Sequence, residues 1–129
     1  MARILLVEDS EQIRDFLSHR LTRRGHEVLL AQDGEDGVSH ARSAQPGIIL
    51  LNMNLPVIDG WTVARTIRTD QQTCTIPIIA LTALALSADQ EKTLQAVCDE
   101  HHPKPINTIQ LFAQIDQLLA RSSALQATA

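Results

Sequence analysis

The chain has 129 residues, of which 44% are hydrophobic and 20% are charged, and this is enough apolar material for the core of one globular domain. A net charge of -4 and an aromatic content of 2% argue against a nucleic-acid-binding face, which needs clustered cations or stacking rings. The apolar segment near the N-terminus stops at Glu8, too early for a membrane span, so we expect a cytoplasmic protein with no nucleic-acid or membrane partner.

Short apolar runs that recur along the chain predict the strands of one sheet. Four runs are continuous and a fifth is weak, and they lie at 4–7, 28–31, 48–51, 76–81 and 100–103. Continuous apolar runs are typical of strands buried on both faces, as in a parallel sheet covered by helices. Pro103 has no N–H to donate to a neighbouring strand, so we expect the fifth strand to lie at the edge of the sheet.

Apolar residues at three-four spacing predict helices between these runs. Capping residues indicate where four of the helices begin: Asp33, Asp59, Ser87 with Gln90, and Asn107 with Gln110. The residues after Arg121 are small and polar. We therefore expect one domain over residues 1–121, followed by a flexible C-terminal tail over 122–129.

Strand and helix alternate about five times, which predicts an α/β fold: a doubly wound, five-stranded parallel sheet flanked by five helices. The chain shows no internal repeat and no inter-domain linker. Ligands of such folds bind outside the carboxyl ends of the strands. The residues that end the predicted strands are therefore the candidates for function.

Polar residues stand at four of these strand ends. Glu8 and Asp9 follow the first strand, Asn52 follows the third, Thr82 the fourth and Lys104 the fifth. Adjacent carboxylates with another oxygen ligand nearby suit a hard cation such as Mg²⁺. A lysine and a hydroxyl beside that cation suit a phosphoryl group.

Each of these residues also has a simpler explanation when it is taken alone. The two acids could favour the start of the next helix through its dipole, and Asn52 could form an Asx turn. Thr82 could be a turn residue and Lys104 a solvated charge. Because all of them fall at strand ends of one predicted sheet, we favour a shared site.

Four segments together resemble the signature segments of CheY-like receiver domains of two-component response regulators. The segments are 7–9, 52–60, 80–83 and 104–105, and the resemblance covers residues 3 to about 120. It implies a stand-alone receiver with the sheet order 2-1-3-4-5. It also implies a Mg²⁺ site made by Glu8, Asp9, residue 52 and the backbone carbonyl of Asn54.

The resemblance implies further roles at the other strand ends. Residue 52 would accept a phosphoryl group from a histidine kinase, Lys104 would contact the phosphoryl oxygens, and Thr82 would turn inward to hydrogen-bond them. His101 matches the position of the switch aromatic, which is usually Tyr or Phe. Lys104–Pro105 would carry a cis peptide, a state that is accessible mainly before proline.

Asn52 is the main departure from the family, because aspartate is the phosphoacceptor there. A neutral amide is a poor nucleophile and forms no acyl phosphate, so we predict that Asn52 takes no phosphoryl group. The loss of one negative charge should also weaken Mg²⁺ binding. Two explanations stay open: an engineered or recently altered Asp→Asn site, favoured because Thr82 and Lys104 are present, or a natural receiver that works without phosphorylation.

Two smaller departures lie between the fourth helix and the fifth strand. Receivers often have glycine where Val97 stands, so either the helix ends differently here or the turn is strained. His101 could weaken the switch or make it sensitive to pH. His101 and His102 point to opposite faces of a strand, so they cannot serve one metal ion.

We expect a signalling domain and not an enzyme, and the chain ends too soon after the fifth helix to include an output domain. Its partners would be a histidine kinase or phosphotransfer protein and a downstream protein effector, bound through the face of the fourth and fifth helices and the fifth strand. It would be a monomer or a weak homodimer. The alternatives are a phosphorylation-independent pseudo-receiver that acts as a binding module, and a flavin or nucleotide enzyme, against which the lack of a glycine-rich phosphate loop argues.

Overall fold

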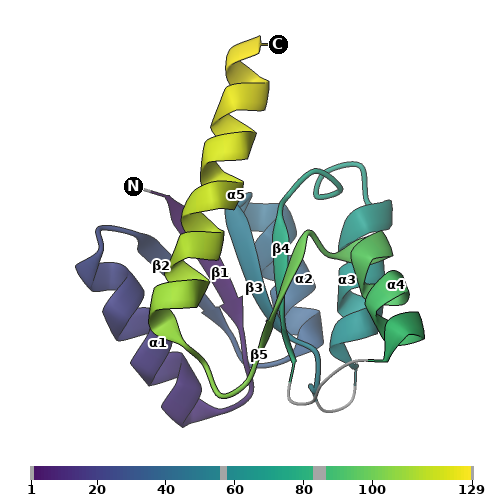
Figure 1. Cartoon of the computed structure of the whole chain (residues 1–129), viewed down its shortest axis with the longest axis horizontal. Coiled ribbons are helices and arrows are strands. Elements are labelled where there is room, and N and C mark those ends of the chain that lie inside the picture. Colours follow the sequence, from purple (N-terminus) through teal and green to yellow (C-terminus); the bar gives the residue numbers. More distant parts are fainter. Residues whose placement is uncertain (1, 56–57, 83–86, 129) are drawn as a thin grey trace.

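The computed structural model describes residues 2–55, 58–82 and 87–128, in which five strands alternate with five helices (Figure 1). The strands are β1 (Arg3–Val7), β2 (Glu27–Ala31), β3 (Ile48–Asn52), β4 (Ile78–Thr82) and β5 (Glu100–Pro103). The helices are α1 (Glu11–Arg23), α2 (Gly34–Ala44), α3 (Gly60–Thr69), α4 (Ala88–Val97) and α5 (Thr108–Thr128). No helix in this part of the chain combines the length and the apolarity needed to cross a membrane.

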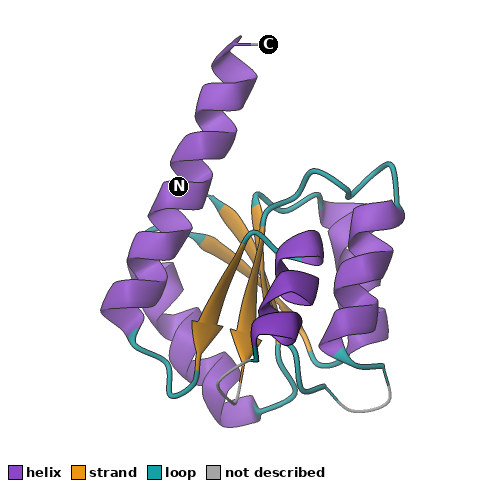
Figure 2. Ribbon diagram, turned by 45° about the vertical axis from the view of Figure 1, so that its right-hand side comes forward, coloured by secondary structure: helices purple, strands orange, loops and turns teal. Residues whose placement is uncertain are grey.

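The strands form one parallel sheet in the order β2-β1-β3-β4-β5, as the resemblance implied. β3 and β4 are buried along their whole length, whereas β5 lies at the edge, as Pro103 predicted. Helices cover both faces of the sheet (Figure 2). The fold is therefore the predicted doubly wound α/β sandwich, and the carboxyl ends of its strands gather at one edge.

Alternate strand residues supply two separate cores, one on each face of the sheet. Leu5, Ile49 and Ala80 point into the core that α2, α3 and α4 cover. Leu6 and Leu50 belong to the core that α1 and α5 cover. Both cores are made almost entirely of aliphatic side chains, which is why the chain folds with so few aromatic residues.

Side-chain caps begin the helices at the predicted positions. Asp33 accepts a hydrogen bond from the first turn of α2, Asp59 does so for α3, and Ser87 forms a reciprocal capping box with Gln90. Asn107 Oδ1 accepts from Gln110 N–H at 3.1 Å, so it caps α5 in the same manner. Each cap satisfies a backbone N–H that has no partner inside its helix.

The ends of α4 and α5 differ from what is usual or expected. α4 ends at Val97 and the following Cys98 is extended, with a φ of -124°, so no left-handed residue is needed and the valine is not strained. α5 continues to Thr128, so Arg121 is not a boundary of secondary structure and the expected tail is helical. Residues 122–128 contain no glycine or proline that would end the helix.

Candidate functional site

The candidate site lies where the chain leaves β1, β3, β4 and β5. Backbone hydrogen bonds continue past the strand ends: Glu8 N–H donates to Ala31 O at 3.0 Å, and Lys104 N–H donates to Thr82 O at 2.7 Å. Met53 N–H donates to Leu81 O of β4 at 3.0 Å. These bonds extend the sheet into the loops, so the predicted site residues project from fixed backbone positions.

The amide of Asn52 links the two acids of the first loop. Its Nδ2 donates to Glu8 Oε2 at 2.8 Å and to Asp9 Oδ1 at 3.0 Å. Its Oδ1 accepts from the backbone N–H of Asn54 at 3.0 Å. Because Oδ1 meets a donor and Nδ2 meets two acceptors, every contact agrees with this orientation of the amide.

Glu8 is fully buried, with an exposed fraction of 0%, and it is surrounded by donors. Lys104 Nζ lies 3.3 Å from Oε1, and Ser10 N–H donates to Oε2 at 3.1 Å. Arg14 donates to the backbone carbonyl of Glu8 at 2.9 Å. A buried carboxylate is tolerated only when it is paired and hydrogen-bonded. Lys104, Ser10 and the Asn52 amide together provide the pairing and the hydrogen bonds for Glu8.

Thr82, the last residue of β4, has a buried hydroxyl. The residue is 3% exposed, and Oγ1 makes no hydrogen bond to any of the residues that the structure describes. A buried hydroxyl without a partner requires an explanation, and a polar ligand that completes the site provides one. Ala83, Pro56 and Val57, which complete the signature segments, lie outside the described residues.

The donor set does not fit a divalent cation in this arrangement. Glu8 and Asp9 supply the oxygen ligands that Mg²⁺ prefers, but the Asn52 amide directs its N–H groups at both of them. A cation would have to displace this amide. In keeping with that, the residues described include no group of three or more Asp, Glu, His or Cys side chains able to hold a metal ion.

The two histidines of β5 lie on opposite faces, as strand geometry predicted. His101, at the position of the switch aromatic, is half-buried and is paired with Ala80 of β4. His102 is buried with an exposed fraction of 1% and bonds to residues of the α5 segment. These contacts of His102 could not be predicted from the sequence, because they depend on how α5 packs against β5. The Lys104–Pro105 bond is cis, as expected.

Gly60 is a site residue whose role sequence reasoning missed. A Cβ at this position would lie 2.4 Å from Met53 Cα and 2.6 Å from the carbonyl oxygen of Asn52. Gly60 N–H also donates to Met53 O at 3.3 Å. The first turn of α3 therefore packs directly on the backbone of the candidate site. The sequence feature that could have indicated this packing role is the glycine directly after the capping residue Asp59.

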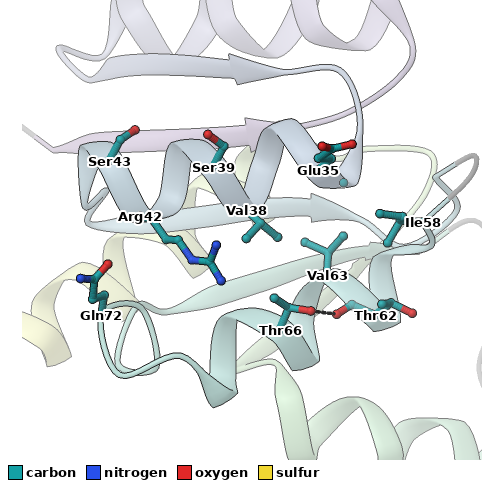
Figure 3. A pocket seen from close by; sticks show the side chains of 11 residues that line it. Glu35, Val38, Ser39, Arg42, Ser43, Ile58, Thr62, Val63, Thr66 and Gln72 are labelled. Carbon is teal, nitrogen blue, oxygen red and sulfur yellow. Dashed lines mark hydrogen bonds between the residues drawn. The ribbon is translucent and has the colours of Figure 1, made fainter.

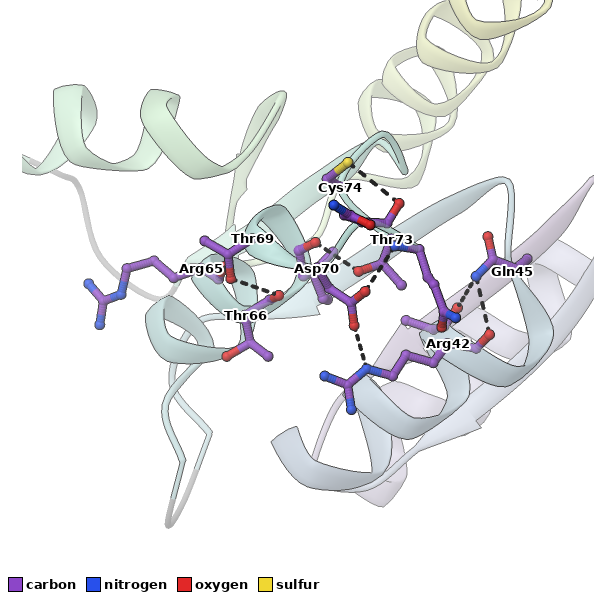
Figure 4. A network of polar contacts seen from close by, with 12 residues as sticks. Arg42, Gln45, Arg65, Thr66, Thr69, Asp70, Thr73 and Cys74 are labelled. Carbon is purple, nitrogen blue, oxygen red and sulfur yellow. Dashed lines mark hydrogen bonds and ion pairs between the residues drawn. The ribbon is translucent and has the colours of Figure 1, made fainter.

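Two further hollows lie outside the strand-end cluster. A groove of about 730 Å³ separates α2 from α3, with Val38 and Val63 on its floor and Arg42 reaching into it (Figure 3). Arg42 forms an ion pair with Asp70, part of a polar network at the end of α3 (Figure 4). Hydrogen bonding from the Gln72 backbone, and then the Arg42 guanidinium, lower the pKa of Asp70.

A mostly apolar hollow of about 470 Å³ adjoins the candidate site and is lined by residues of α1 and of the loop after β5: Gln12, Ile13, Phe16, Lys104, Pro105 and Ile106.

A protein family and several known proteins match most of this chain. The response regulator receiver domain family matches residues 4–116. The transcriptional regulatory protein AfsQ1 of Streptomyces coelicolor is 40% identical over 94% of this chain, and the dual master transcriptional regulator RpaA of Synechocystis is 34% identical over 97%. This chain spans 52% of the length of each of these two relatives.

Solved structures show the same fold. The chemotaxis protein CheY4 of Vibrio cholerae superposes with a TM-score of 0.85 at 31% identity, covering 92% of this chain and 98% of that one. The receiver domain of the sensor histidine kinase PA1611 of Pseudomonas aeruginosa superposes with a TM-score of 0.84 at 34% identity and the same coverage. That structure holds a magnesium ion in its active-site cleft.

Proposed function

This chain belongs to the response regulator receiver domain family of two-component signalling, and from that membership we propose that it is a receiver whose phosphoryl transfer is blocked at Asn52. With aspartate at residue 52, the site would take a phosphoryl group from a histidine kinase or a phosphotransfer protein. With asparagine, the domain signals only through its contacts with other proteins.

The observation that carries this proposal is the direction of the Asn52 amide. Its nitrogen is committed to Glu8 and Asp9, and its oxygen accepts a backbone N–H. An amide oxygen is neutral and a much poorer nucleophile than a carboxylate. Asn52 stands where the nucleophile of a receiver should be. Its amide is a poor nucleophile, and both polar atoms of its side chain are already hydrogen-bonded.

The rest of the site supports phosphoryl chemistry. The Thr82 hydroxyl is buried with no hydrogen-bond partner among the residues that the structure describes, and the Lys104 ammonium lies beside Glu8. A hydroxyl donor and a fixed cation are the groups that stabilise the oxygens of a transferring phosphoryl group. Because Thr82 and Lys104 are both present, we favour the explanation that Asn52 is an altered residue in an otherwise ordinary receiver site.

We propose that Mg²⁺ binds weakly to this chain. The cation normally neutralises the acidic cluster of a receiver, and the Asn52 amide partly replaces that role with two N–H donors. In an aspartate form, Glu8, Asp9, residue 52 and the Asn54 carbonyl would hold the cation. The ion would supply positive charge against the acids and the phosphoryl oxygens.

The domain would act in the cytoplasm as a binding partner and not as an enzyme, as a monomer or weak homodimer. The apolar hollow beside Lys104, with the half-exposed Phe16 on its rim, supports contact of a phosphodonor protein with α1 and the loop after β5. The α4-β5-α5 face, which includes His101, would contact the effector.

A natural pseudo-receiver is the second candidate function. It is favoured by the same amide, because its N–H groups already satisfy one oxygen of Glu8 and one of Asp9. Such a domain would need neither Mg²⁺ nor phosphate to reach its binding conformation. The two candidates differ in whether one substitution restores phosphoryl transfer.

The test is intact mass after incubation with acetyl phosphate and Mg²⁺. The native chain, Asn52→Asp and the matched control Asn54→Asp, which adds the same charge two residues away, are compared. We expect a phosphoryl adduct only on Asn52→Asp. No adduct on any of the three would refute the blocked-receiver proposal and leave the binding module.

A further inference from the structure

His102 is a buried polar residue on the edge strand β5, on the face that α5 covers. Its Nε2 accepts a hydrogen bond from the backbone N–H of Asn107 at 3.1 Å, and its Nδ1 lies 3.0 Å from Gln114 Oε1. A backbone N–H can only donate, so Nε2 is the acceptor. The neutral ring therefore carries its proton on Nδ1 and donates it to Gln114.

Gln114 continues the same set of contacts. Its Nε2 donates to the backbone carbonyl of His101 at 3.0 Å. The imidazole and the amide thus each donate and accept, and together they tie β5 to the first turns of α5. We call the three residues His102, Asn107 and Gln114 the β5–α5 clamp.

The clamp encloses the loop that carries Lys104. One end of this loop is held by Lys104 N–H, which donates to Thr82 O at 2.7 Å, and the other end is held by His102 at Asn107. Between these two held ends, the Lys104 side chain extends toward Glu8, and its Nζ lies 3.3 Å from Glu8 Oε1. A short loop held at both ends restricts where its side chains can reach.

We propose that His102 is a positioning residue for Lys104: the β5–α5 clamp holds the loop so that the ammonium stays over the candidate site. His102 itself does not touch the site residues and acts only through the backbone of residues 103–107. An apolar side chain could fill the same space, but it would leave Asn107 N–H without its acceptor. The loop would then move at its α5 end.

The two lysines of this chain allow a direct measurement on the native protein. Lys92 is exposed on α4, and Lys104 is half-buried in its ion pair, so Lys92 serves as an internal reference for amine acylation. The acylation rate of each lysine is read by peptide mass spectrometry. Hydrogen exchange at the Asn107 amide reports whether the clamp is closed.

Four variants separate positioning from simple loss of stability. His102→Leu removes the acceptor, and His102→Gln restores one in an amide of similar reach. Thr73→Val removes a buried hydrogen bond to Ile67 O at the opposite end of the sheet and serves as the matched control. His102→Asn, whose shorter amide reaches Gln114 but not Asn107, opens the clamp at one end only.

We expect His102→Leu and His102→Asn to raise the Lys104-to-Lys92 acylation ratio about 10-fold, in step with faster exchange at Asn107. His102→Gln should restore the native ratio, and Thr73→Val should leave it unchanged. Faster exchange at Asn107 with an unchanged ratio would overturn the proposal, and so would a freely exchanging Asn107 amide in the native chain. A rise of the same size in Thr73→Val would assign the effect to stability.

For phosphoryl transfer, the inference rests on the proposed function and is tested in the Asn52→Asp background. There His102→Leu should slow phosphorylation by acetyl phosphate roughly 10- to 100-fold, because a displaced Lys104 no longer meets the phosphoryl oxygens. His102→Gln should recover most of the rate. An unphosphorylated Asn52→Asp would refute the proposed function alone, since the acylation ratio judges the clamp without it.

Discussion

Asn52→Asp should destabilise the chain in the absence of a divalent cation and make its stability depend on Mg²⁺. The substitution replaces two N–H donors, 2.8 Å from Glu8 Oε2 and 3.0 Å from Asp9 Oδ1, with an oxygen that repels both acids. A hydrogen bond to a charged group contributes about 1.5–3 kcal/mol, so the loss of two corresponds to about 3–6 kcal/mol. Rearrangement of the exposed Asp9 reduces this, and we expect a loss of roughly 2–4 kcal/mol in the free energy of unfolding.

Magnesium should return much of that loss to Asn52→Asp and stabilise the unsubstituted chain only slightly, because Asn52 weakens its binding. A ligand at 100 times its dissociation constant stabilises the folded state by about 2.7 kcal/mol. Urea denaturation in EDTA and in excess Mg²⁺ measures this. The signal is the fluorescence of the single tryptophan, Trp61, because this residue of α3 is partly buried against the core. Asn54→Asp is the control for added charge.

Two results would refute this reasoning. If Asn52→Asp is as stable as the native chain in EDTA, the amide contacts contribute little to the fold. If Mg²⁺ stabilises the native chain as much as the variant, the amide does not compete with the cation.

Other predictions concern single sites. Gly60→Ala should cost about 1–3 kcal/mol because its Cβ would overlap the β3 backbone, whereas Gly47→Ala, with its nearest atoms at 3.6 Å, should be nearly neutral in the same urea assay. Burial raises the pKa of the Cys98 thiol to about 12, so native protein at pH 8 should react with a thiol reagent only at the partly exposed Cys74, and at both in urea; two fast thiols in the native state would contradict this. Asp59→Ala should cost about 1 kcal/mol at pH 7 through loss of the α3 cap. The hydrogen bond from the first turn of α3 lowers the pKa of Asp59. The stability that this bond adds is therefore present above the carboxyl's unfolded pKa and disappears as the pH falls through the folded pKa. A difference in unfolding free energy between Asp59→Ala and the unsubstituted chain that persists at pH 2 would count against the charged cap.

Local patterns in the sequence were sufficient for the strands, the caps and the position of the site. Buried parallel strands read as continuous apolar runs, and Pro103 identified β5 as one of the two edge strands. Asp33, Asp59 and Ser87 act through residues three positions away, so their roles can be read from neighbouring letters. The strand-end residues converge because parallel strands end at one edge.

The sequence could not predict contacts between distant segments. The direction of the Asn52 amide depends on Glu8, and the burial of His102 depends on Gln114, which belongs to another element. Gly60 is required by the close approach of one backbone to another, which no composition or periodicity encodes. The continuation of α5 past Arg121 was not predicted for a different reason, since small polar residues weaken a helix but do not end it.

The length of α5 changes the scale of any motion at its start. Its 21 residues, at 1.5 Å of rise each, form a rod about 30 Å long that extends beyond the sheet at the C-terminal end (Figure 1). The contacts of His102 and Gln114 lie near the beginning of this rod, close to Lys104, so a tilt of α5 with these contacts as the pivot would move its far end the most. A tilt of roughly 5° at the pivot would carry the far end through about 3 Å, a displacement comparable to half a helical turn.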